Sequence, residues 1–130
     1  MAHTVGYKED RPWGGFEVLA VDSAHVVKRL VVNPGKRLSD QRHEGRVEHW
    51  VCVDGVGLVH LEFQDGRKET ITFSRYENST ITIPTRVWHR LDNTGGGAPL
   101  VIIETWVGLT CDEADIERRD DDFGRVEVAA

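Results

Sequence analysis

Short strand-like segments separated by regularly spaced turns limit this chain to an all-β fold. Runs rich in β-branched and aromatic residues recur up to residue 106, and turn signals such as Asn33-Pro34-Gly35 and Gln64-Asp65-Gly66 separate them. The expected strands are residues 16–21, 26–32, 49–53, 56–63, 69–73, 79–83, 87–91 and 100–106. Strands of about four to eight residues with turns every eight to twelve residues predict a β-sandwich or a β-barrel.

Three segments carry more specific expectations. Asp54-Gly55 is a favoured hairpin dipeptide, so residues 56–63 are predicted to pair back on residues 49–53. Thr110 and Glu113 have the spacing of a helix capping box, which predicts a short helix or turn over residues 112–117. The polar residues 1–10 are expected to be ordered only by docking, and the charged tail is typical of a solvated terminus.

Composition excludes several classes of protein. The 130 residues are enough for one domain with its own core, and 39% hydrophobic with 29% charged residues is typical of a soluble globular chain. The apolar runs are far too short to span a membrane, and the N-terminus has no apolar signal segment, so a cytoplasmic protein is expected. A net charge of −6 argues against a nucleic-acid partner. Cys52 and Cys111 are expected to be reduced thiols.

Four side chains could form one metal site. Gln41 and His43 are separated by one residue, so in an extended segment they share a face. Glu48 has the opposite parity, but a turn at residues 44–46 would reset it, and His89 would come from another strand. Oxygen and imidazole donors together suit zinc, manganese or iron. The spacing by itself leaves a metal site and a structural role equally open.

Other polar residues have weaker patterns. His49 follows Glu48, so alternation predicts that it points away from the site. His60 lies in an alternating strand without chemical neighbours, which favours a structural role. Lys28, Arg46, Arg90 and Arg125 could gather into an anion pocket, or each could be a solvated charge.

Residues 35–55 and 84–93 resemble the two motifs of the cupin superfamily. The first motif fits with Gln41 in place of its first histidine, and the second fits from Pro84 onward, with Asn78 and Arg86 where the family often has glycine. The resemblance implies a double-stranded β-helix, or jelly-roll barrel, which the short C-terminal helix or tail expected from the capping box would follow. It also implies one divalent metal ion inside the barrel, bound by Gln41, His43, Glu48 and His89. Zinc is the first expectation, with manganese, cobalt, nickel or iron as alternatives.

A narrower resemblance covers nearly the whole chain. The segments at residues 11–14, 27–30, 33–39, 41–43, 46–50, 83–84, 89–93 and 121–125 are similar to the C-terminal cupin domain of type II mannose-6-phosphate isomerases. In that family the domain is often fused behind a mannose-1-phosphate guanylyltransferase domain. Here a single cupin domain over residues 1–130 is expected, standing alone and forming a homodimer. Glu44-Gly45 departs from the family, which commonly has histidines there.

The resemblance implies an isomerase that interconverts mannose 6-phosphate and fructose 6-phosphate through an enediolate stabilised by the metal. Arg90 and Arg125, and then Lys28, are expected to bind the phosphate, and the tail is predicted to fold back over the barrel mouth to bring Arg125 there. Catalytic roles are expected for Lys28, Glu104 and Arg125, with Lys28 and Glu104 as candidates for moving the proton. A non-catalytic cupin that binds a sugar phosphate or a sugar nucleotide is the alternative, and a metal-dependent oxygenase is a third reading.

Overall fold

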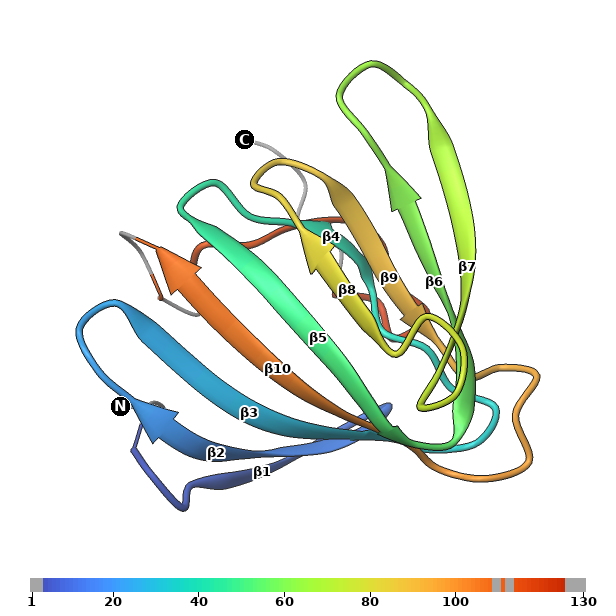
Figure 1. Ribbon diagram of the computed structural model, residues 1–130, viewed down its shortest axis with the longest axis horizontal. Helices are drawn as coiled ribbons and strands as arrows, with labels where there is room; N and C mark the ends of the chain where they lie inside the picture. Colours follow the sequence, from blue (N-terminus) through green and yellow to red (C-terminus); the bar gives the residue numbers. More distant parts are fainter. Residues whose placement is uncertain (1–3, 109–110, 112–113, 126–130) are drawn as a thin grey trace.

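The computed structural model describes residues 4–108, 111 and 114–125, which form two antiparallel sheets that face each other (Figure 1). The first sheet has the order β1 (Lys8–Arg11), β2 (Gly14–Val21), β3 (His25–Val32), β10 (Leu100–Gly108), β5 (Arg46–Asp54) and β8 (Thr80–Ile83). The second has the order β11 (Glu117–Asp120), β4 (Asp40–Arg42), β9 (Trp88–Asp92), β6 (Val56–Glu62) and β7 (Lys68–Ser74). The all-β prediction is confirmed.

All eight strands expected from the sequence are present, with bounds that differ by a few residues. Alternation explains how they pack: in β10 every second residue from Leu100 to Trp106 is buried, and these side chains point toward the opposite sheet. Phe73, Leu91, Leu100 and Ile102 fill part of the space between the sheets. None of the described residues forms a helix that is long and apolar enough to cross a membrane.

The predicted hairpin at Asp54-Gly55 is wrong. β6 pairs with β7 and β9 in the second sheet, whereas β5 pairs with β8 and β10 in the first. The chain therefore crosses from one sheet to the other at Gly55, which has a φ of 83°. A Cβ atom at this position would collide with the carbonyl oxygen of Pro99, so the crossing requires glycine.

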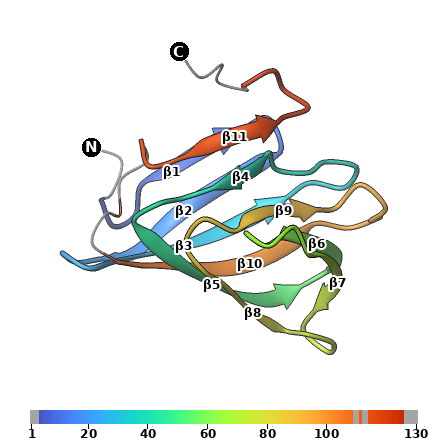
Figure 2. The ribbon, with the colours of Figure 1, turned by 90° about the horizontal axis from the view of Figure 1, so that it is seen from above.

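Both ends of the chain also differ from expectation. Residues 8–11 do not merely dock, because they form β1 and pair with β2. Thr110 and Glu113 lie outside the described residues; of the segment expected as a helix or turn, Ala114 is in a turn and Glu117 begins β11. The tail is a strand paired with β4, as Figure 2 shows, and not a solvated terminus.

The position of β1 and β11 at the sheet edges explains why the hydrophobic pattern of the sequence did not predict them. β1 and β11 are outer strands of their sheets. Glu9 and Arg11 of β1 form an ion pair with each other, whereas charged side chains of β11 form ion pairs with neighbouring strands. In β11, Arg119 Nε lies 2.7 Å from Asp40 Oδ2, and Glu117 Oε1 lies 2.8 Å from Arg42 Nε. Charge on an edge strand is compatible with sheet pairing, although it reads as a solvated run in the sequence.

Candidate metal centre

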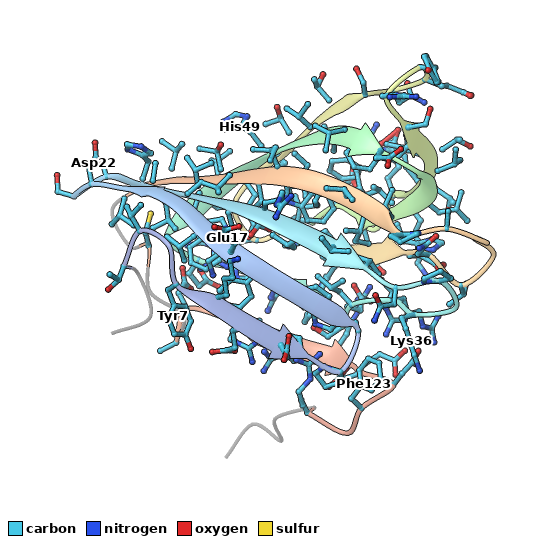
Figure 3. All side chains as sticks on the ribbon, turned by 90° about the horizontal axis from the view of Figure 1, so that it is seen from below. Tyr7, Glu17, Asp22, Lys36, His49 and Phe123 are labelled. Carbon is cyan, nitrogen blue, oxygen red and sulfur yellow. The ribbon has the colours of Figure 1, made fainter. Side chains whose placement is uncertain are left out.

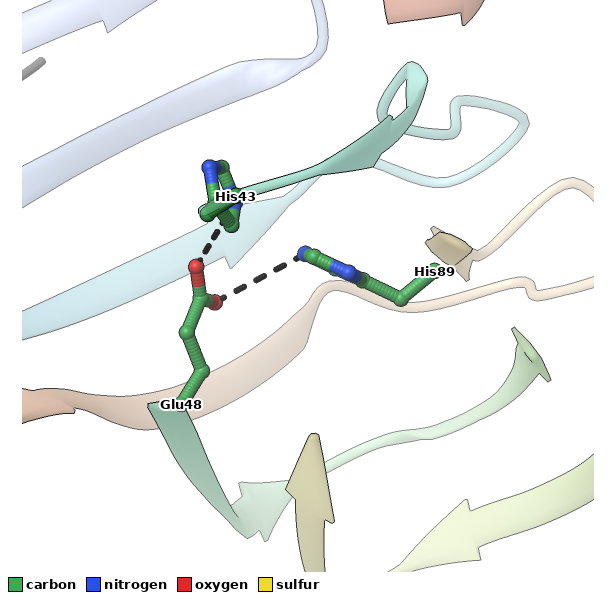
Figure 4. A group of neighbouring side chains, drawn as sticks. All are labelled: His43, Glu48 and His89. Carbon is green, nitrogen blue, oxygen red and sulfur yellow. Dashed lines mark ion pairs between the residues drawn. The ribbon is translucent and has the colours of Figure 1, made fainter. Parts of the chain in front are cut away.

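Three buried side chains meet between the two sheets. His43 follows β4, Glu48 lies in β5 and His89 lies in β9, so the donors come from both sheets (Figure 4). His43 Nε2 is 2.8 Å from Glu48 Oε2, and His89 Nε2 is 3.8 Å from Glu48 Oε1. One donor atom from each residue lies within 4.8 Å of the others, an arrangement that could hold a metal ion.

The backbone orients both imidazole rings. His43 Nδ1 lies 2.6 Å from the carbonyl oxygen of Asp115, and His89 Nδ1 lies 2.9 Å from that of Val87. A carbonyl oxygen only accepts hydrogen bonds, so each Nδ1 carries a proton and donates it. Metal-binding histidines are commonly held in this way by the ring nitrogen that does not bind the metal. The Nε2 of His89 is buried without a hydrogen-bond partner, and an ion between the rings and Glu48 would satisfy it.

Charge and burial hold Glu48 and His89 in the forms that a metal requires. Burial acts to raise the pKa of Glu48, but His43, His89 and Arg46 outweigh it and hold that pKa well below the usual value. Burial lowers the pKa of His89 to about 4, so its ring is neutral near pH 7. The guanidinium of Arg46 lies 3.1 Å from Glu48 Oε2 and 3.1 Å from His43 Nε2. A carboxylate and neutral imidazoles are the donor forms that divalent metals bind.

Gln41 is placed beside this group. It lies in β4 directly opposite His89 in β9, and it lines the cavity that contains Glu48 and His89. Its Nε2 donates to Ser39 Oγ at 3.2 Å, which leaves the amide oxygen as the atom that could bind a metal.

A second carboxylate lies next to Glu48. Glu104 in β10 is opposite Lys28 in β3 on one side and Trp50 in β5 on the other. Trp50 Nε1 donates both to Glu48 Oε1 at 3.0 Å and to Glu104 Oε2 at 3.1 Å. Burial first, and then the charge of Glu48, raise the pKa of Glu104 well above its usual value. Two carboxylates this close do not both ionise easily without an added cation.

Aromatic rings hold the buried cations of the cavity. Lys28 Nζ lies 4.2 Å from the ring centre of Phe16 and 4.0 Å from that of Trp106. The guanidinium of Arg46 lies 3.5 Å from the same Trp106 ring. Cation–π contacts of this kind stabilise positive charge away from water.

The cavity concentrates positive charge in an acidic protein. Among the residues that the structure describes, its lining includes the basic residues Arg11, Lys28, Arg46, Arg118 and Arg125, but only two carboxylates, Glu48 and Glu104. Lys28, Arg46 and both glutamates are buried, whereas Arg11, Arg118 and Arg125 are partly exposed and so mark its opening. With a net charge of −6 for the whole chain, this local excess is suited to an anionic ligand.

The structure does not bring Arg90 into this group. Arg90 follows His89 in β9, so its side chain points to the opposite face of the sheet. Its guanidinium is hydrogen-bonded to the Leu38 carbonyl at 2.8 Å and to Asp120 Oδ2 at 2.9 Å. Arg90 thereby anchors the tail.

Arg125 does reach the cavity, because the tail returns along the barrel. Figure 3 shows Phe123 of the tail beside Lys36, and Arg37 Nε binds Asp122 Oδ2 at 2.8 Å. Arg125 itself is oriented by Asp121, whose Oδ2 lies 2.7 Å from its Nε.

Two histidines lie elsewhere: His49, as alternation predicts, and His60, which does have polar neighbours in Asp92 and Thr70. His49 lies on the outer face of its sheet (Figure 3). His60 is held by Asp92 Oδ2 at 2.8 Å on the second sheet, a structural contact. The cysteines are unpaired, with Cys52 buried and Cys111 partly buried.

Sequence reasoning missed two cavity arginines and one contact of His43. Arg11 stands before Pro12-Trp13 and was not among the candidates for an anion pocket, and Arg118 belongs to the unrecognised strand β11. Asp115, whose carbonyl binds His43, is 72 residues away in the sequence. A pairing this distant leaves no local pattern that could reveal it.

The departures from the cupin motif are explained by backbone geometry. Asn78 and Arg86, which stand where the family often has glycine, have positive φ values of 50° and 62°. The left-handed conformation that glycine favours is therefore kept. Arg86 Nε also lies 2.7 Å from Glu44 Oε2, so two departures form an ion pair next to His43.

Comparison with known proteins agrees with this geometry. A family model described as "Mannose-6-phosphate isomerase C-terminal" matches residues 1–121. The chain is 40% identical over 115 residues to the alginate biosynthesis protein AlgA of Pseudomonas aeruginosa, covering 88% of this chain and 22% of the relative. It is 38% identical over 124 residues to a mannose-1-phosphate guanylyltransferase of Escherichia coli, covering 95% of this chain and 24% of the relative. The chain thus spans about a quarter of the length of these relatives.

Solved structures show the same fold. The capsular polysaccharide assembling protein CapF of Staphylococcus aureus superposes with a TM-score of 0.73 at 17% identity, over 88% of this chain and 34% of that one. Oxalate decarboxylase of Bacillus subtilis superposes with a TM-score of 0.73 at 10% identity, over 91% of this chain and 31% of that one. At these identities the likeness concerns the cupin fold alone. Together with the match over residues 1–121, it shows that this chain is a cupin of the mannose-6-phosphate isomerase C-terminal family.

Proposed function

We propose that this domain is a metal-dependent aldose–ketose isomerase that interconverts mannose 6-phosphate and fructose 6-phosphate. One observation carries the proposal: in a chain of this family, His43, Glu48 and His89 converge beside a cavity in which basic residues outnumber carboxylates. A metal-ligand group would handle the carbonyl and hydroxyl oxygens of a sugar, and the surplus of positive charge suits a phosphate.

The metal would be held by His43, Glu48 and His89, with the amide oxygen of Gln41 as a fourth ligand. A divalent ion there would supply positive charge that stabilises negative charge developing on the sugar oxygens. Mixed nitrogen and oxygen donors make zinc the first candidate, with manganese, cobalt, nickel and iron as alternatives.

The phosphate would be bound at the opening of the cavity. Arg11, Arg118 and Arg125 are the partly exposed basic residues of its lining, and a guanidinium fork suits a phosphate. Lys28 is buried deeper, beside Glu104, and would serve the sugar end of the substrate. Arg90 has no part in this proposal, because it does not line the cavity and points to the opposite face of its sheet.

Glu104 is the residue to which we assign proton transfer between carbons 2 and 1 of the sugar. Two carboxylates of the described residues line the cavity, and Glu48 faces both histidines, so Glu104 is the one of the two left to act as a base. Trp50 holds Glu104 in place through a 3.1 Å hydrogen bond, and Lys28 on the neighbouring strand can offset its negative charge.

The test is a coupled assay that detects fructose 6-phosphate formed from mannose 6-phosphate. Metal-stripped protein should regain turnover when zinc, manganese or cobalt is added, and His43→Ala should not. Glu104→Gln should bind metal normally but lose turnover, whereas Arg90→Gln should retain the chemical step. Metal binding without turnover for any added metal would refute the isomerase.

A non-catalytic sugar-phosphate binding domain is the second candidate. It is favoured by the departure at Glu44-Gly45, where a charged pair with Arg86 replaces the family's histidines close to His43. Calorimetry with mannose 6-phosphate distinguishes the two candidates, because this one predicts binding with no product. The homodimer stays a prediction for either candidate, to be measured by light scattering.

A further inference from the structure

One residue of the C-terminal tail holds the turn that carries a metal ligand. Asp115 lies just before β11, and its carbonyl oxygen accepts the hydrogen bond of His43 Nδ1 at 2.6 Å. Its side-chain Oδ1 accepts from the backbone N–H of Glu44 at 2.9 Å, and its Oδ2 accepts from that of Gly45 at 2.9 Å. Asp115 therefore binds three consecutive residues, from His43 to Gly45.

The contacts of Asp115 have different consequences. The backbone contact fixes the ring of His43, because a proton held on Nδ1 leaves Nε2 facing Glu48. The side-chain contacts fix the backbone of the turn, since both carboxylate oxygens are used on adjacent N–H groups. This turn also resets the strand parity, so that His43 and Glu48 can point to the same place.

Other contacts hold Asp115 itself in position. It is followed by β11, which runs beside β4 (Figure 2), and β4 leads directly into His43. At the end of β11, Arg90 binds Asp120 at 2.9 Å, and just after the strand Arg37 binds Asp122 at 2.8 Å. The tail is thus a fixed support on which Asp115 can orient the His43 turn.

We propose that Asp115 is a positioning residue for the metal centre: its carboxylate fixes the His43 turn so that His43, Glu48 and His89 can bind one ion together. This role rests on the proposed metal binding and does not depend on isomerase turnover. Partners that orient a metal ligand typically contribute about 10- to 100-fold to metal affinity.

The test measures Co²⁺ binding by the whole chain, by calorimetry and from the visible absorption that reports ligand geometry. Asp115→Ala should bind Co²⁺ roughly 10- to 100-fold more weakly with an altered spectrum. Asp115→Asn keeps one acceptor for the turn and should fall between Asp115→Ala and the unmodified protein. Asp122→Ala is the matched control, because it removes a tail carboxylate that binds Arg37 and not the His43 turn, and it should leave affinity and spectrum unchanged.

Three outcomes would overturn the proposal. Equal Co²⁺ affinity in Asp115→Ala and the unmodified protein would show that the carboxylate does not position His43. Equal weakening in Asp122→Ala would show that the tail acts only as a general support. If the unmodified protein binds no metal, the metal centre and the role of Asp115 fail together.

Metal binding that depends on Asp115, but without turnover, would refute the isomerase and leave the positioning role intact. Thermal melting shows whether Asp115→Ala is folded, and Asp115→Asn tests the role if it is not.

Discussion

In β5, β9 and β10, the inward side chains are apolar along one half of the strand and mostly polar or charged along the other. The inward side chains of β10 are Leu100 and Ile102 in one half, but Glu104 and Trp106 in the other. In β9, the inward residue Leu91 belongs to the apolar half and His89 to the charged half. The backbone pairing is the same in both halves.

The difference shows how one scaffold divides stability from chemistry. Alternation decides which side chains face inward, and residue type then decides what each half contributes. The apolar half gains free energy from buried surface, whereas the charged half bears the cost of burying Lys28, Glu48 and Glu104. A substitution in the apolar half should therefore lower the free energy of unfolding and leave metal affinity unchanged. A substitution in the charged half should change metal affinity or turnover without lowering the free energy of unfolding.

Ile102→Ala tests the apolar half and should have the largest effect on folding. The side chain is completely buried, so the substitution leaves a cavity and should lower the free energy of unfolding by about 2–5 kcal/mol. Urea denaturation measures this loss. Metal affinity of the folded variant should stay the same, and a parallel loss of affinity would contradict the division between the halves.

Glu48→Gln tests the charged half. The variant keeps the shape of the side chain but loses the charge that faces both histidines. Metal affinity should therefore fall by roughly 100-fold or more, which is more than the loss expected when a residue that only orients a ligand is removed. Calorimetry with Zn²⁺ measures the change. The control is His49→Gln, an exposed position next to it, which should bind Zn²⁺ normally. Equal affinities for the two variants would exclude Glu48 as a ligand.

Lys28→Met combined with Glu104→Leu tests whether the charged half costs stability. Apolar residues that replace buried charges are often neutral or stabilising, so the free energy of unfolding should be unchanged or rise by about 1–4 kcal/mol. Turnover should disappear, because the double variant lacks Glu104. Urea denaturation and the coupled assay measure the two effects. A fall in stability as large as that of Ile102→Ala would show that these charges stabilise the fold.

Local patterns predicted most of what the two halves share. Each expected strand is present, and the alternation that buries Leu91 also brings His89 inward. The same alternation places Arg90, the next residue, on the opposite face of the sheet. The expected phosphate role of Arg90 was based on the charge of the side chain and ignored the direction in which the side chain points. The turn near residue 45 was predicted correctly, and it is what allows Glu48 to face His43.

Long-range pairing could not be predicted from the sequence. β11 pairs with β4, and no local pattern in residues 117–120 indicates that partner. Arg118 and Asp115 owe their places at the site to this pairing. The crossing at Gly55 was missed for a related reason, since a glycine turn signals a change of direction but not the sheet that the next strand joins.

The turns of the two halves give the smallest and most specific prediction. In the apolar half only glycine fits at Gly55, because a side chain there would meet the backbone of Pro99. In the charged half Arg86 has a φ of 62° while carrying a side chain, which strains the backbone by about 1–2 kcal/mol.

Arg86→Gly should therefore be more stable than Arg86→Ala by about 1 kcal/mol, although alanine is the more stable residue by about 0.4–1 kcal/mol where φ is negative. Both variants lose the exposed pair with Glu44, so the comparison between them isolates the backbone. Urea denaturation of both variants decides the sign, and an Arg86→Ala variant at least as stable as Arg86→Gly would show that this turn relaxes without strain.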